Sequence, residues 1–173
     1  MEERILEILK TLVAMKSVSC STVEVEPAEW FAGFFKTLPY FEKHPEDTGL
    51  YEIPGDPYGR KIPYAFLKGK KTDTVLLSGH FDVVSTEEYG KAEPWAYEVG
   101  TSKLEEMLRK MPLDDVAKAD LESGEWIWGR GVADMKGGLA IHAALFEQYA
   151  KILLRGGDLL QLPKIVLQLG GII

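Results

Sequence analysis

Residues 74–84 read TVLLSGHFDVV, and this stretch predicts a buried strand that ends at a reactive side chain. The run Thr74–Leu77 contains no charge and no break, as expected of a strand that is covered on both faces. His80 follows this run closely. Because ligand sites in open α/β sheets gather just beyond the carboxyl ends of strands, His80 is placed where a ligand or catalytic group would act.

Asp82 follows His80 at a spacing of two residues. A carboxylate at this spacing can orient the histidine ring while one ring nitrogen binds a metal ion. The tripeptide also fits a histidine with a purely structural role, so both interpretations stay open at this point.

A second string, GRGVADMKGG at residues 129–138, places Asp134 in a loop that leads from a strand into a helix. Its glycines allow unusual backbone angles and a close approach of the chain to a site. The alternative is that Asp134 caps the helix by accepting hydrogen bonds from backbone N–H groups.

Helices and strands alternate along the rest of the chain, which predicts an α/β layer fold. Apolar residues at three- and four-residue spacing predict helices, and short apolar runs between turn residues predict strands. The predicted helices are Glu2–Lys16, a segment from near Pro27 to the break at Leu38–Pro39, and Lys136 to about Leu154, ended by Gly156–Gly157; the predicted strands are Leu50–Ile53, Ile62–Leu67, Thr74–Ser78 and Ile165–Leu169. Residues 85–125 are rich in Glu, Lys and Asp, which predicts a solvated insertion with one helix from about Ser102 to Lys110.

Composition excludes several classes of partner. The formal net charge is −7, whereas phosphate binding needs clustered Lys and Arg, so no nucleic-acid partner is expected. Apolar runs are too short to span a bilayer, and the acidic start of the chain does not resemble an export signal. The single cysteine, Cys20, cannot form an internal disulfide, which fits a cytoplasmic protein.

The two strings together resemble the M20 family of zinc metallopeptidases and amidohydrolases, in which G-H-x-D-V-V precedes a G-R-G-x-x-D-M-K-G-G loop. The resemblance implies a layered α/β/α zinc-peptidase-like catalytic domain with a mixed, mostly parallel sheet. It also implies two zinc ions, with His80 as a ligand of one and Asp134 as the carboxylate that bridges both. Asp82 would orient His80 and support catalysis, and Asp134–Met135 is a candidate cis peptide.

A finer resemblance is to the arginine-utilisation branch of this family. The segments that carry it are Leu38–Phe41, His44–Glu46, Asp56–Arg60 and the long acidic insertion after His80. It implies a hydrolase that cleaves amide or peptide bonds in a small substrate and acts in arginine or amino-acid catabolism. In such an enzyme the zinc ions polarise the carbonyl group and lower the pKa of a bound water, and a glutamate takes its proton.

The family places that glutamate in an acidic pair after the next strand, whereas only Gly170–Ile173 follows Ile165–Leu169. The resemblance therefore implies that residues 1–173 are the N-terminal part of the catalytic domain, without the lid or dimerisation domain. We expect the chain alone to be inactive. The alternatives are a non-catalytic truncated product or interaction module, and a single-zinc role for His80 and Asp134, although two protein ligands are few for tight binding.

Three further residues have chemical potential but favour ordinary roles. His142 lies in an apolar helix and is predicted to belong to the core or its boundary. His44 lies in a polar turn and is predicted to be exposed, and Cys20 is predicted to be a buried or loop thiol without a partner motif. The sequence leaves the substrate and the oligomeric state open.

Overall fold

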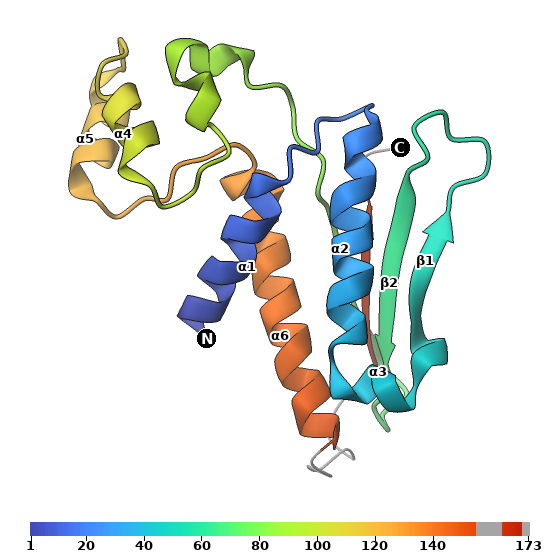
Figure 1. Ribbon diagram of the computed structural model, residues 1–173. Coiled ribbons are helices and arrows are strands. Elements are labelled where there is room, and N and C mark those ends of the chain that lie inside the picture. Colours follow the sequence, from blue (N-terminus) through green and yellow to red (C-terminus); the bar gives the residue numbers. More distant parts are fainter. Residues whose placement is uncertain (155–163, 171–173) are drawn as a thin grey trace.

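The computed structural model describes residues 1–154 and 164–170, which form a sheet with helices packed on it (Figure 1). The sheet has the strand order β1-β2-β4-β3. Its strands are β1 (Thr48–Glu52), β2 (Lys61–Leu67), β3 (Thr74–His80) and β4 (Lys164–Gly170). The four predicted strands and the α/β class are therefore confirmed.

The sheet is mixed, as expected, but its described pairings are not mostly parallel. β3 and β4 are parallel, with Val75 opposite Ile165, whereas β1–β2 and β2–β4 are antiparallel. A parallel pair needs a long crossover connection, and α6 (Gly137–Leu154) lies within the connection from β3 to β4. Short connections join β1 to β2 and β2 to β3, so these successive strands run in opposite directions.

Helices cover one face of the sheet. α2 (Val25–Lys36) packs on β1 and β2, α6 packs on β3 and β4, and α1 (Glu2–Ala14) packs beside α6 (Figure 1). Burial alternates along β2 and β4, so Ala65, Leu67 and Leu167 point into this helix layer and are fully buried. The helices predicted at the N-terminus, near Pro27 and after the second string are confirmed, whereas the predicted Gly156–Gly157 end lies outside the described residues.

The opposite face of the sheet is open among the described residues. Tyr51, Tyr64 and Leu76 point away from the helix layer and are 55%, 39% and 57% exposed. The prediction that Thr74–Leu77 is covered on both faces is therefore wrong for the described part of the chain. The reason is topological, because β3 is an edge strand of the described sheet and the helix that packs on it, α6, belongs to the layer on one face.

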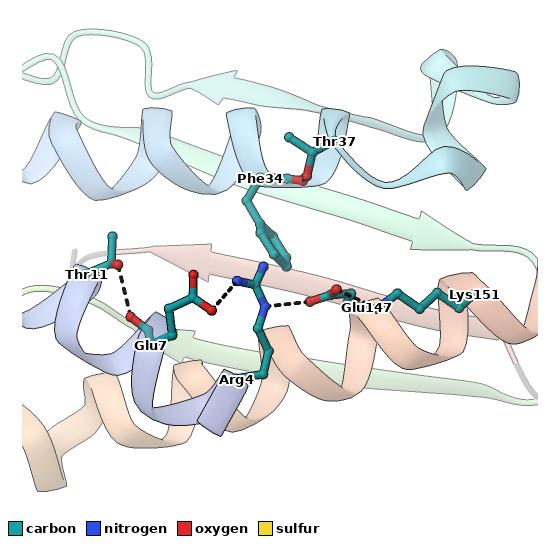
Figure 2. Close-up of polar contacts among 7 residues, drawn as sticks. All are labelled: Arg4, Glu7, Thr11, Phe34, Thr37, Glu147 and Lys151. Atoms are coloured by element: carbon teal, nitrogen blue, oxygen red, sulfur yellow. Dashed lines mark hydrogen bonds and ion pairs between the residues drawn. The ribbon is translucent and has the colours of Figure 1, made fainter. Parts of the chain in front are cut away.

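A partly buried ion-pair network fastens α1 to α6 (Figure 2). The Arg4 Nε donates to the Glu147 carboxylate at 2.9 Å, and Lys151 Nζ donates to the same carboxylate at 2.7 Å. Burial raises the pKa of Glu147, but the hydrogen bonds from Lys151 and Arg4 outweigh it, so the net shift is downward. The Arg4 guanidinium also lies over the Phe34 ring at 5.9 Å, which links the pair to α2.

The acidic insertion contains the helix predicted from about Ser102 to Lys110, and it folds with two further helical segments into a small lobe. It contains a 3-10 segment at Glu87–Trp95, then α4 (Ser102–Leu108) and α5 (Asp115–Ser123), which lie apart from the sheet in Figure 1. The lobe has its own apolar cluster, built on Ala92, Leu104, Leu108 and Leu121. α5 was not predicted because it buries few apolar residues, although its ends carry clear signals: Asp114 accepts from Ala117 N, and Gly124 is left-handed.

None of the described helices combines the length and hydropathy that crossing a lipid bilayer requires.

Candidate metal centre

The two strings singled out from the sequence meet at the carboxyl end of β3. His80 is the last residue of β3, and Asp134 lies in a π-type turn, Val132–Lys136, that leads into α6. The His80 Nε2 lies 3.1 Å from the Asp134 Oδ1. Asp134 precedes the first residue of α6 by three positions, so it does not occupy the capping position of that helix. Its side chain is 87% exposed and faces the His80 ring.

Asp82 lies on the other side of the His80 ring. Its Oδ1 is 3.2 Å from the His80 Nδ1, and its backbone carbonyl oxygen is also 3.2 Å from that nitrogen. Both neighbours of Nδ1 are acceptors, so a proton on Nδ1 would satisfy them. In that tautomer the lone pair of Nε2 would point towards Asp134 and could bind a cation placed between them. The proposed role of Asp82 as the group that orients His80 is compatible with this geometry.

The donor set fits a divalent zinc ion. In a tetrahedral site with metal–ligand bonds of roughly 2.1 Å, two ligand atoms lie roughly 3.4 Å apart, close to the 3.1 Å between Nε2 and Oδ1. An imidazole nitrogen and a carboxylate oxygen are common zinc ligands, and a carboxylate behind the imidazole is the usual supporting arrangement. His80 and Asp134 would hold the ion, and Asp82 would fix the ring.

Two glycines allow the loop to turn tightly and to lie against the segment that follows β3. A Cβ on Gly131, which has φ +77°, would lie 2.6 Å from Val83 Cγ1, and a Cβ on Gly137 would lie 2.4 Å from the Val132 carbonyl oxygen. Larger residues would push the loop away from the site. The Asp134–Met135 peptide bond is cis, as predicted.

A cavity of about 170 Å³ opens at these residues. It is lined by Ser19, His80, Asp82, Val83, Val84, Arg130 and Asp134. The Arg130 guanidinium lies over the Tyr89 ring at 5.1 Å and forms an ion pair with Glu88, so the helical lobe is fastened to the wall of the cavity.

Sequence reasoning missed Ser19 and Lys136. No motif in the sequence connects Ser19 with Asp82. Lys136 carried a signal that could have been used, since a cation just before a helix opposes the helix dipole and needs another reason to be there. It is fully buried and its Nζ donates to the Met15 carbonyl oxygen at 2.6 Å. Burial lowers the pKa of Lys136 to about 8, against the opposite influence of Glu26 and Asp82.

The other histidines lie away from this site. The His142 Nδ1 is buried without a hydrogen-bond partner among the described residues, and burial lowers the pKa of His142, in agreement with a boundary position. His44 forms a group with Glu46 and Asp47 in which three ligand atoms lie within 4.8 Å of one another. We do not assign a metal there, because Lys68 Nζ lies 2.6 Å from the Asp47 carboxylate and already balances its charge.

No family model matches the sequence. Three solved structures share the fold: the dipeptidase Dug1p of Saccharomyces cerevisiae, the M20 family metallo-carboxypeptidase Sso-CP2 of Sulfolobus solfataricus, and human carnosine dipeptidase 1. Their TM-scores are 0.59, 0.55 and 0.56 at 17%, 18% and 18% sequence identity. They cover 98%, 96% and 98% of this chain, which spans 32%, 30% and 32% of theirs. The fold that the resemblance to the M20 peptidase family implies is therefore confirmed.

Two proteins of Bacillus subtilis (strain 168) are related in sequence. RocB is 34% identical over 144 residues, and YqjN, whose function is uncharacterised, is 38% identical over 148 residues. These matches cover 82% and 85% of this chain but 25% and 26% of the relatives. The chain thus spans about a quarter of the length of the curated relatives it matches.

Proposed function

We propose that the chain supplies part of the metal centre of a hydrolase that cleaves amide or peptide bonds. The observation that carries this proposal is the His80–Asp134 pair, 3.1 Å apart at the carboxyl end of β3, with Asp82 behind the ring. The fold shared with two dipeptidases and a metallo-carboxypeptidase supports the reaction class.

His80 and Asp134 would bind zinc, and Asp134 has room to bridge a second ion because its side chain is largely exposed. Bound zinc would polarise the scissile carbonyl and lower the pKa of a water molecule. Asp82 would keep the Nδ1 proton of His80 in place, which leaves Nε2 unprotonated. The substrate would be a small amide or peptide, and similarity to RocB supports a place in arginine or amino-acid catabolism, in the cytoplasm.

We further propose that residues 1–173 do not complete the catalytic site. Among the described residues, those lining the cavity include two aspartates but no glutamate that could act as the general base. Release of amino acids from a panel of dipeptides and N-acyl amino acids should be undetectable with the zinc-loaded chain. A polypeptide that extends this sequence to the length of its relatives should release them. Turnover by the short chain would overturn this part of the proposal.

The metal site itself can be tested by titrating the 15N-labelled chain with zinc chloride while following the ring nitrogens of its histidines. We expect the His80 Nε2 resonance to shift and saturate, while the resonances of His44 and His142 stay in place. His80→Ala and Asp134→Ala should abolish saturable binding at this site, and His44→Ala should leave it unchanged as the control. A shift at His44 instead, or none at His80, would contradict the proposal and favour a non-catalytic interaction module.

A further inference from the structure

Ser19 lies directly behind Asp82. Its Oγ is 2.6 Å from the Asp82 Oδ2 and 3.2 Å from the Val83 carbonyl oxygen. A hydroxyl group has one proton to donate, and the shorter distance together with the negative charge of the acceptor directs it to the carboxylate. Ser19, Asp82 and His80 therefore form a continuous chain of hydrogen bonds that ends at the ring nitrogen opposite the proposed metal.

The Asp82 side chain is only 2% exposed, so its carboxylate needs hydrogen-bond partners within the protein. A buried carboxylate is stable only when its oxygen atoms are hydrogen-bonded or paired with charge. Oδ1 faces the His80 ring, and the hydroxyl group of Ser19 faces Oδ2. The bond to Oδ2 fixes the rotation of the carboxylate, which determines whether Oδ1 points at the His80 Nδ1.

The backbone next to Ser19 is held by other contacts. Ser17 Oγ donates to the Phe81 carbonyl oxygen at 2.6 Å, and the Val83 N–H donates to the Ser17 carbonyl oxygen at 2.9 Å. The Ser19 N–H also donates to the Val83 carbonyl oxygen at 2.9 Å. The junction between residues 17–19 and 81–83 is thus formed without the Ser19 hydroxyl group, whose remaining task is to hold the Asp82 carboxylate.

We propose that Ser19 is a positioning residue of the metal centre, which acts through Asp82 to hold His80 in the orientation and tautomer that bind a divalent cation. This inference rests on the proposed function, since it assumes that His80 binds the metal. In this role the Ser19 hydroxyl group acts through its bond to the Asp82 carboxylate and is not a ligand of the cation.

The experiment uses the same zinc titration, with four variants of the chain. Ser19→Ala and Ser19→Val remove the hydroxyl group, Ser19→Thr keeps it, and Ser17→Ala is the matched control that weakens the same junction without touching Asp82. Loss of a hydrogen-bonded supporting group weakens metal binding by about 10–100-fold. Ser19 contacts Asp82 and not the His80 ring itself, so we expect an effect at the lower end of this range. The zinc dissociation constant should rise about tenfold for Ser19→Ala and Ser19→Val.

Ser19→Thr should bind zinc like the unchanged chain, and Ser17→Ala should lose stability in urea denaturation but keep its zinc affinity. The ring nitrogen shifts of His80 should show a smaller fraction of the Nδ1–H tautomer in the hydroxyl-free variants before zinc is added. Thr and Val have nearly the same shape, so their comparison holds even if Ser19→Ala does not fold. Equal zinc affinity and equal tautomer fractions in the Thr and Val variants would overturn the inference alone. A His80 resonance that does not respond to zinc in the unchanged chain would overturn the proposed function and the inference with it.

Discussion

Replacing Phe35 with alanine is expected to lower the free energy of unfolding by about 3–5 kcal/mol, the usual range for removing a buried phenyl ring. Phe35 lies on α2 and is fully buried. Its ring centre is 5.7 Å from that of Phe146 on α6 and 6.4 Å from that of Phe41 on α3 (Pro39–Lys43). The ring therefore joins three helices of the layer that covers the sheet, and its removal would leave a cavity that these helices cannot close without moving apart.

Urea denaturation followed by far-ultraviolet circular dichroism measures this loss. Phe66→Ala is the matched control, because Phe66 lies on β2 but points to the open face of the sheet, out of register with the buried Ala65 and Leu67. Its loss should lower the free energy of unfolding by about 1–2 kcal/mol, below the range for a fully buried ring. Equal losses for the two variants would contradict the assignment of the core to the helix layer.

The types of the main elements could be predicted because the local pattern of apolar residues is strong. α1 and α2 show apolar residues at helical spacing, and β2 and β4 contain short apolar runs. What covers an element could not be predicted in the same way. The apolar run in β3 indicates a strand, but whether Val75 and Leu76 are buried depends on which segments pack on that strand, and a local pattern does not contain this information.

The candidate site shows the same division between local and distant information. His80, Asp82 and Asp134 stand in two strings whose residues are close in sequence, so the motif pairs could be recognised. Ser19 reaches the site from a segment 63 residues before Asp82, and no local spacing connects the two. The link depends on the short parallel contact between Val18 and Val83, which forms only when the chain after α1 lies alongside the chain after β3.

Lys136, in the loop of the candidate site, is the second residue whose replacement should have a large effect, because its amine is fully buried. Burial lowers the pKa of Lys136 from 10.5 to about 8 in the folded chain, and the nearby carboxylates of Glu26 and Asp82 offset this only in part. A base with a lowered folded-state pKa binds fewer protons than it does in the unfolded chain. Its burial therefore lowers stability below about pH 8, and this penalty is removed as the pH rises towards 10.5.

The size of the change follows from the two pKa values, since a drop from 10.5 to about 8 corresponds to about 3 kcal/mol. Lysine and tyrosine side chains ordinarily have pKa values of about 10. The informative quantity is therefore the difference in the free energy of unfolding between the unchanged chain and a variant without the Lys136 amine. Lys136→Met keeps the length and apolar stem of the side chain, and it removes the proton that titrates.

Urea denaturation of both proteins between pH 7 and pH 10.5 should show that the unchanged chain gains stability relative to Lys136→Met, by up to about 3 kcal/mol over this range. At pH 7 the free energies of unfolding of the two proteins should differ by less than at pH 10.5. The variant loses the hydrogen bond to the Met15 carbonyl oxygen, but it also loses the cost of the buried charge, and these two effects oppose each other. A constant difference across the pH range would show that Lys136 titrates near 10.5 in the folded chain, and that the amine is hydrated there. A difference that moves in the opposite direction would require a folded-state pKa above 10.5, and hence a stronger pairing with Glu26 or Asp82 than burial can offset.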